Sequence, residues 1–209
     1  MLADPITAIE EALITRLQSG LGRMVTEVAS YAGELDDDLP TVVRRFPAVW
    51  VTFGGISKTE PYGASKDKFK ATGQFVVMVG SRNLRGGSAA RQGRDGIGTN
   101  QLVMAVRKLL NQQDLGLEIA HFKPGKVRTL YNTRIEGAAL QVFACEFDTA
   151  WIESALENNA FPVQTDPLFS GFAGTVSPAN PDLLQIGINY HQTPDDGVAD
   201  ASDLLTLRS

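Results

Sequence analysis

The sequence predicts an α+β fold, namely a mainly antiparallel or mixed β-sheet of about five strands with two α-helices packed on one face, followed by an extended C-terminal arm. Three observations lead to this prediction. Over the first 154 residues, helix and strand patterns follow one another as helix, three strands, helix, two strands. Consecutive strands joined by short loops favour antiparallel pairing. After residue 154, the composition changes abruptly.

The first helix is expected from residue 5 to about residue 19. Asp4 suits the N-cap, and Pro5 suits the first helical position because proline lacks the amide proton that would stay unpaired there. Gly20 is a plausible stop. Apolar residues recur at helical spacing at Ile6, Ile9, Leu13 and Leu17.

Three strands are expected next, at residues 24–31, 48–53 and 73–80. The third is nearly continuous in apolar residues, which predicts that it is covered on both faces. Between the first two strands, the acidic residues of 34–40 fit the N-terminal end of a short helical turn, where negative charge meets unpaired amides.

A loop and a second helix follow. Residues 81–96 contain four arginines and four glycines and are expected to form a mobile loop. The helix is expected from about Thr99, acting as N-cap, to about Gln112, with Arg107 and Lys108 near its negative C-terminal end. Its apolar face consists of Leu102, Val103, Val106, Leu109 and Leu110.

Two more strands are expected at residues 126–131 and 138–152. The second alternates, so that its two faces can be assigned. The face toward the helices consists of Phe143, Cys145, Phe147, Thr149 and Trp151. The opposite face consists of Leu140, Val142, Ala144, Glu146 and Asp148.

The charges divide the chain into a body, residues 1–154, and an acidic, proline-rich arm, residues 155–209. The whole chain has a formal charge of −5. The arm carries seven acidic residues and one arginine, a net charge of −6, and five of the ten prolines. The body is left with a net charge of +1. Such a shift marks the boundary between a compact part and an extended one.

Sequence motifs for catalysis are absent. No phosphate-binding loop, dinucleotide-binding glycine motif, nucleophile elbow or zinc-protease helix occurs. His121, His191 and Cys145 have no neighbours that would make them catalytic, and Cys145 fits a small core position. The acids at 36–38 and 195–203 lack the spacing of a calcium loop. We therefore expect no enzyme, no cofactor and no metal site.

Other features bear on location. The longest apolar runs are far shorter than a membrane span, and the acids Asp4, Glu10 and Glu11 are atypical of a secretory signal. We expect a protein that does not enter a membrane and is made in the cytoplasm. The single cysteine excludes an intrachain disulfide.

Two segments are candidate interaction sites. The basic loop, containing Arg82, Arg85, Arg91 and Arg94, could contact phosphates of DNA or pair with acids of a neighbouring subunit. In the arm, two strand-like pieces at 186–190 and 204–207 could add to an exposed sheet edge of a neighbour. A disordered arm is the alternative, against which its apolar clusters argue. The candidate arm residues are Phe169, Phe172, Leu184, Ile186, Ile188, Tyr190, Leu204, Leu205 and Leu207.

Six segments together carry a resemblance to a known family. They are VASYAGELDDDL (28–39), FPAVWVTFGG (46–55), FVVMVGSRNL (75–84), LLNQQDLG (109–116), KPGKVR (123–128) and FACEFDTAW (143–151). In this order and spacing, the body resembles a family of Mu-like bacteriophage virion proteins, encoded between the head-tail joining and tail shaft genes.

The resemblance implies a tail terminator, which is a ring, hexameric in related phages, on the head-proximal end of the tail tube. Its implied partners are itself, the tail tube protein, a neck, stopper or connector protein, and the sheath if the tail is contractile, with non-specific contact to DNA in the lumen. The implied location is the virion neck, with the host cytoplasm during assembly. A head-tail adaptor or stopper is the alternative, and a DNA-binding module is a third interpretation that rests on the basic loop.

Overall fold

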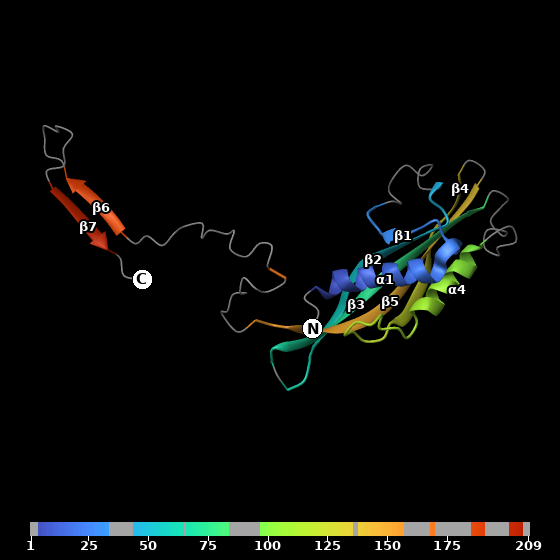
Figure 1. Ribbon diagram of the computed structural model, residues 1–209, viewed down its shortest axis with the longest axis horizontal. Coiled ribbons are helices and arrows are strands. Elements are labelled where there is room, and N and C mark those ends of the chain that lie inside the picture. Colours follow the sequence, from blue (N-terminus) through green and yellow to red (C-terminus); the bar gives the residue numbers. More distant parts are fainter. Residues whose placement is uncertain are drawn as a thin grey trace. The chain divides into compact units, whose positions relative to one another are not determined.

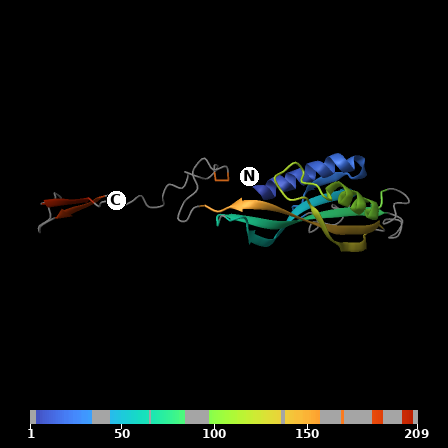
Figure 2. The same cartoon turned by 90° about the horizontal axis from the view of Figure 1, so that it is seen from below.

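The computed structural model describes residues 4–33, 44–64, 66–83, 97–135, 138–156, 168–169, 185–190 and 201–206. They belong to two compact units, Met1–Ala160 and Phe161–Ser209. In the first unit, a twisted five-stranded sheet carries two helices on one face, as Figures 1 and 2 show. The predicted fold class is confirmed.

The sheet has the strand order β1-β2-β3-β5-β4. Its strands are β1 (Glu27–Ser30), β2 (Ala48–Pro61), β3 (Lys68–Asn83), β4 (Lys123–Ile135) and β5 (Ala138–Ser154). All neighbours are antiparallel except β1 and β2, which are parallel. The antiparallel pairing expected for consecutive strands is therefore wrong for this pair. The connection over residues 31–47 is long enough to return the chain to the same end of the sheet.

The two central strands are longer than predicted. β2 continues beyond Phe53 to Pro61, and β3 begins at Lys68 rather than at Gly73. The added residues are mostly exposed and polar, so hydrophobic patterning gave no sign of them. They are held in strands by backbone pairing with each other and, for β3, with the end of β5.

Helix α1 (Pro5–Leu21) begins as predicted. The Asp4 carboxylate accepts a hydrogen bond from the Thr7 amide at 3.1 Å. Hydrogen bonding by the Thr7 side chain, followed by that of the Thr7 amide, lowers the pKa of Asp4. The helix passes through Gly20 and ends at Leu21. Its C-cap is Gly22, which has a φ of 47° and opens the short 3-10 helix η1 (Gly22–Met24). The predicted stop at Gly20 is therefore wrong.

Gly20 instead lets the two helices approach closely. A Cβ at this position would lie 2.5 Å from Cδ2 of Leu109 in helix α4 (Thr99–Leu110). Next to this contact, Nε of Arg16 donates to the Leu109 carbonyl at 3.2 Å. The guanidinium thus satisfies one of the carbonyls that are left unpaired at the C-terminal end of α4, where the helix dipole favours positive charge.

Thr99 does not serve as the N-cap of α4, as the sequence suggested. Gly98 occupies the cap position without a side-chain hydrogen bond, and Thr99 is the first helical residue. Its side chain is fully buried, and its hydroxyl is hydrogen-bonded to the Ser81 hydroxyl near the end of β3. Thr99 therefore joins the helix to the sheet, because a buried hydroxyl needs a partner.

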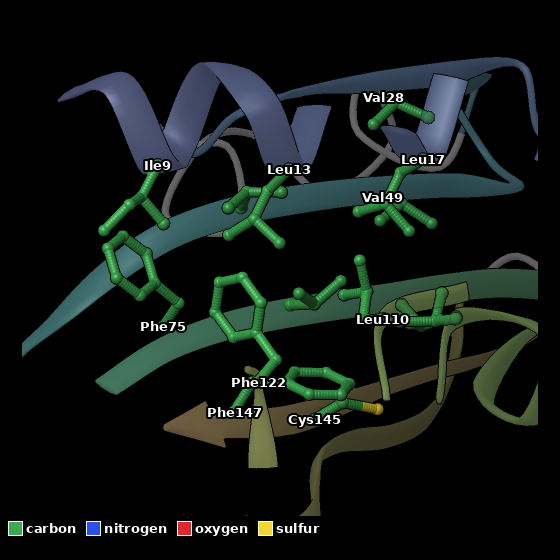
Figure 3. Packing of buried hydrophobic residues seen from close by; sticks show 14 of the residues in the cluster. Ile9, Leu13, Leu17, Val28, Val49, Phe75, Leu110, Phe122, Cys145 and Phe147 are labelled. Atoms are coloured by element: carbon green, nitrogen blue, oxygen red, sulfur yellow. The ribbon is translucent and has the colours of Figure 1, made fainter. Parts of the chain in front are cut away.

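The main core lies between the helices and the sheet. Ile9, Leu13 and Leu17 of α1 point down onto the strands, as Figure 3 shows. Phe122, which is fully buried, is placed edge-on to both Phe75 and Phe147, with ring centroids 6.2 and 6.5 Å apart. The other apolar members include Val49, Val77, Leu102, Val106, Leu110, Cys145 and Trp151.

A second, smaller apolar cluster involves the other face of the sheet. The predicted alternation of β5 is confirmed, because Cys145, Phe147 and Trp151 join the helix-covered core whereas Leu140 and Val142 join this second cluster. Its remaining buried members are Phe46, Ala48, Trp50 and Met78. The rings of Phe46 and Trp50 meet edge to face at 5.6 Å.

In the second unit, β6 (Gln185–Tyr190) and β7 (Ala201–Thr206) form an antiparallel two-stranded sheet. Ile186 is paired with Leu205, and Tyr190 with Ala201. The strand-like piece predicted at 186–190 lies within β6, whereas β7 begins three residues before the second predicted piece.

We predict that Gly80→Ala destabilises the body by about 1–3 kcal/mol, the usual cost of overpacking. A Cβ at Gly80 would lie 1.8 Å from Cε1 of Phe46. The cost should shrink in a Phe46→Leu background, because the smaller side chain leaves room. Urea unfolding of the original chain, the two single variants and the double variant measures the cost of Gly80→Ala in both backgrounds. Equal costs in the two backgrounds would show that the ring is not the obstacle.

Candidate assembly surfaces

Among the described residues, no group of three or more potential metal ligands comes together. None of the described helices has the length and hydropathy needed to cross a membrane. Beside α4 there is a shallow hollow lined by Met104, Ala105, Arg107, Lys108 and Asn111. It presents two cations and an exposed methionine, with no carboxylate or nucleophile among its lining residues.

The two candidate nucleophile or base positions in the body have ordinary surroundings. His121 lies on an exposed connection, with Nε2 3.7 Å from the carboxylate of Asp114. Cys145 is fully buried in the core. Burial raises the pKa of the Cys145 thiol to about 11, although the charge of Arg107 acts in the opposite direction. The thiol is therefore protonated at neutral pH and is shielded from solvent.

The structure describes only the first arginine of the basic loop. Arg82 is exposed and stands near the end of β3, where its backbone is opposite Leu140 of β5. Arg85, Arg91 and Arg94 lie outside the described residues. The contact that we expect of this loop, with DNA or with a neighbouring subunit, remains a prediction.

The arm residues are described in part. The side chains of Phe169 and Tyr190 are 36% and 48% exposed, and Ile188 is half-buried. The Tyr190 hydroxyl donates to Oδ2 of Asp203 at 3.3 Å across the hairpin. The backbones of Ile186, Leu204 and Leu205 lie in β6 and β7, whereas Phe172, Leu184 and Leu207 lie outside the described residues.

Sequence reasoning missed one surface, the outer edge of β4. β4 is the last strand of the sheet, and three of its apolar side chains are exposed: Val127 by 40%, Leu130 by 41% and Tyr131 by 37%. The strand also holds four basic residues and no acid, a pattern that could be read directly from the sequence. What could not be read is its place at the edge, because that depends on β5 lying between β3 and β4.

One ion pair fastens this edge to the sheet. Arg128 of β4 lies 2.6 Å from the carboxylate of Glu146 on β5, whose side chain is only 8% exposed. Gln74 of β3 donates weakly toward Glu146 and Asp148, at 3.5 and 3.4 Å. A carboxylate removed from water needs such partners, so Arg128 holds β4 in place and is not free for another ligand.

The ends of β2 and β3 form a second projecting surface. From Ile56 to Lys68 the described side chains are all exposed, and Lys58 pairs with Glu60 at 2.8 Å. Figure 1 shows this end of the hairpin beyond both helices. Ile56 and Tyr62 are its large exposed apolar residues, at 46% and 49%. Such a hairpin can contact another protein without changing the core.

The chain matches a known protein family. The sequence model of a family described as "Bacteriophage Mu, Gp37" matches residues 5–152, which is more than two thirds of the chain. The match runs from the first residue of α1 to within two residues of the end of β5. No curated protein matches the chain.

We predict that the Cys145 thiol does not react with a thiol reagent in the native protein at pH 8, because it is buried and protonated. In urea above the unfolding midpoint, one thiol per chain should become reactive. The absorbance of a chromogenic disulfide reagent measures both states, with Cys145→Ala as the blank. Rapid labelling of the native chain would contradict the burial of this residue.

Proposed function

Because the chain belongs to the Bacteriophage Mu, Gp37 family, we propose that it is a phage structural protein and that it acts as a tail terminator. In this role, six copies form a ring on the head-proximal end of the tail tube. The ring stops tube polymerisation and joins the tail to the neck of the particle. The protein then resides in the virion, after assembly in the host cytoplasm.

The observation that carries the proposal is the family match, which spans both helices and nearly all of the five-stranded sheet. The surfaces of the described residues support it. Exposed apolar side chains lie on an edge strand, on a projecting hairpin and in the arm, which are surfaces suited to protein contacts. The single cysteine, Cys145, is buried and protonated at neutral pH, so it offers no accessible nucleophile.

The mechanism is geometric. Subunits that meet head to tail around an axis close into a ring if the angle between them divides a full turn. One face of such a ring fits the last layer of tube subunits, and the opposite face does not repeat that fit. Polymerisation therefore ends when the ring binds. No bond is made or broken, so the protein needs no cofactor.

The partners follow from the position of the ring. One face binds the tail tube protein, and the other binds a neck, stopper or connector protein. If the tail is contractile, the rim also meets the sheath. The arginines of the basic loop, Arg82, Arg85, Arg91 and Arg94, would contact DNA phosphates in the lumen or acids of the next subunit.

We predict that the purified chain forms closed rings that cap isolated tail tubes. Electron microscopy of the protein alone and mixed with tubes tests this, and capped tubes should stop growing when tube subunits are added. Rings that bind portal or neck proteins but ignore tubes would indicate a head-tail adaptor. Filaments would indicate a tube subunit, and monomers that bind duplex DNA a DNA-binding module.

We also predict that deleting residues 161–209 leaves the body folded but impairs ring formation. The deletion removes the second compact unit and leaves the core of the first unit intact. Circular dichroism checks the fold, and sedimentation checks the assembly. If the shortened chain still forms rings and caps tubes as before, the arm is not needed for assembly.

A further inference from the structure

We propose that the outer edge of β4 in one subunit binds the β6–β7 hairpin of another copy of the chain. The hairpin would extend the five-stranded sheet across the boundary between subunits. The inference rests on the proposed ring, because it needs a neighbouring copy. It names the surface that receives the arm, which neither the family match nor the sequence identifies.

The first step is that β4 is an open edge. Among the described residues, no backbone hydrogen bond joins Lys126–Ile135 to any segment other than β5. Just before this stretch, the Gly125 carbonyl accepts from Arg107 at 3.4 Å. In an antiparallel pair, every second residue directs its amide and carbonyl away from the partner. About half of the ten residues Lys126–Ile135 thus offer backbone donors and acceptors to another strand.

The second step concerns the distribution of exposed apolar residues. Of the ten large hydrophobic residues that are exposed in the described part of the chain, three lie on β4 and four lie from residue 156 onward. Those on β4 are Val127, Leu130 and Tyr131. Those of the arm are Leu156, Leu168, Phe169 and Tyr190. Of these four, Tyr190 lies in the hairpin, at the end of β6. Placing the hairpin against β4 would cover Tyr190 together with the apolar residues of the edge and so remove them from water.

The third step is charge. β4 contains Lys123, Lys126, Arg128 and Arg134 and no acid, and of these Arg128 is already paired with Glu146 of β5. The stretch from β6 to β7, residues 185–206, contains Asp195, Asp196, Asp200 and Asp203 and no lysine or arginine. Asp203 lies in β7, and the other three acids lie outside the described residues. Opposite charges favour this pairing.

The same charges disfavour the obvious competitor, which is pairing of two β4 edges with each other. Like charges would then face each other along the strand. Two register shifts in the β4–β5 pairing, at Pro124/Val127 and Thr129/Tyr131, also make the edge irregular. Lysines and bulges are the devices by which edge strands avoid uncontrolled self-association. An acidic hairpin is therefore the partner that this edge accepts.

The fourth step is that the hairpin is incomplete by itself. Among the described residues of the second unit, two strands of six residues each form the sheet. A two-stranded hairpin is at best marginally stable in water, and a third strand or a packed helix is needed to stabilise it. Pairing with β4 would provide that third strand.

The connection is long enough to reach a neighbour. Twenty-eight residues separate Leu156 from Gln185. Fully extended, they span at most about 100 Å. A body of this size has a radius of gyration of only about 15 Å. The hairpin can thus reach β4 of the next subunit without strain in the connection.

The test uses two full-length chains with tags of different size, one carrying Thr129→Cys and the other Ser202→Cys. Both positions are exposed, on β4 and β7 respectively. After mixing, dissociation and reassembly, a short bismaleimide should join the two chains into one product of summed mass. The matched control replaces Thr129→Cys by Glu11→Cys on the exposed side of α1, where the product should fall to background.

Charge reversal provides a second experiment. Lys123→Glu with Lys126→Glu should abolish the cross-link, and so should Asp196→Lys with Asp200→Lys in the other chain. Combining the two reversals should restore it, which mere misfolding of either chain would not allow. Arg128 is left unchanged because it holds Glu146.

The outcomes separate the inference from the proposed function. If rings cap tubes but no cross-link forms between β4 and β7 of different chains, the inference is overturned and the proposed terminator function is not. Absence of both rings and cross-link would overturn both. If a chain carrying both cysteines cross-links only within itself, the hairpin binds its own β4, and the inference is overturned. A cross-link between chains that tolerates every charge reversal would overturn the electrostatic argument.

Discussion

The fold depends on the pairing of β3 with β5, an antiparallel ladder of sixteen residue pairs, from Lys68↔Ser154 to Asn83↔Ala139, without a register shift. It places β2 and β4 on its two sides and provides the floor of the core. Because β5 is engaged by β3 on one side and by β4 on the other, β4 becomes the edge of the sheet. The surface that we assign to assembly is thus a consequence of the pairing that holds the body together.

The same ladder explains how both faces of the sheet bury aromatic rings. On β3, Gly73 leaves room for Trp151, since a Cβ there would lie 2.5 Å from its ring, and Gly80 leaves room for Phe46. Under the helices, Phe122 enters from the connection after α4 and fills the space between Phe75 and Phe147. The buried carboxylate of Glu146 on β5 is paired with Arg128 of β4, whereas Oε1 of the buried Gln141 on β5 has no hydrogen-bond partner. A body packed in this way can act as a rigid part of an assembly.

Local patterns in the sequence were sufficient to predict features that depend on neighbouring residues along the chain. The spacing of Ile9, Leu13 and Leu17 predicted the buried face of α1, and alternation predicted both faces of β5. Features that depend on distant segments were not predictable. Thr99 forms no cap because Ser81, eighteen residues away, provides its partner. The parallel pairing of β1 with β2 and the edge position of β4 depend on the order of the strands in the sheet. Hydrophobic periodicity does not report that order. The interaction residues of the arm and the basic loop stay predictions.

These observations describe a phage protein of the Bacteriophage Mu, Gp37 family that we propose to work by shape, with an edge strand completed by a neighbour. Hydrogen exchange of the full-length protein, measured by mass spectrometry above and below its association concentration, tests this most directly. Our account predicts that peptides covering Lys126–Ile135 and β6–β7 are protected together in the associated state and exchange rapidly on dilution. The same exchange of Lys126–Ile135 in both states would show that this edge stays open and would contradict the account.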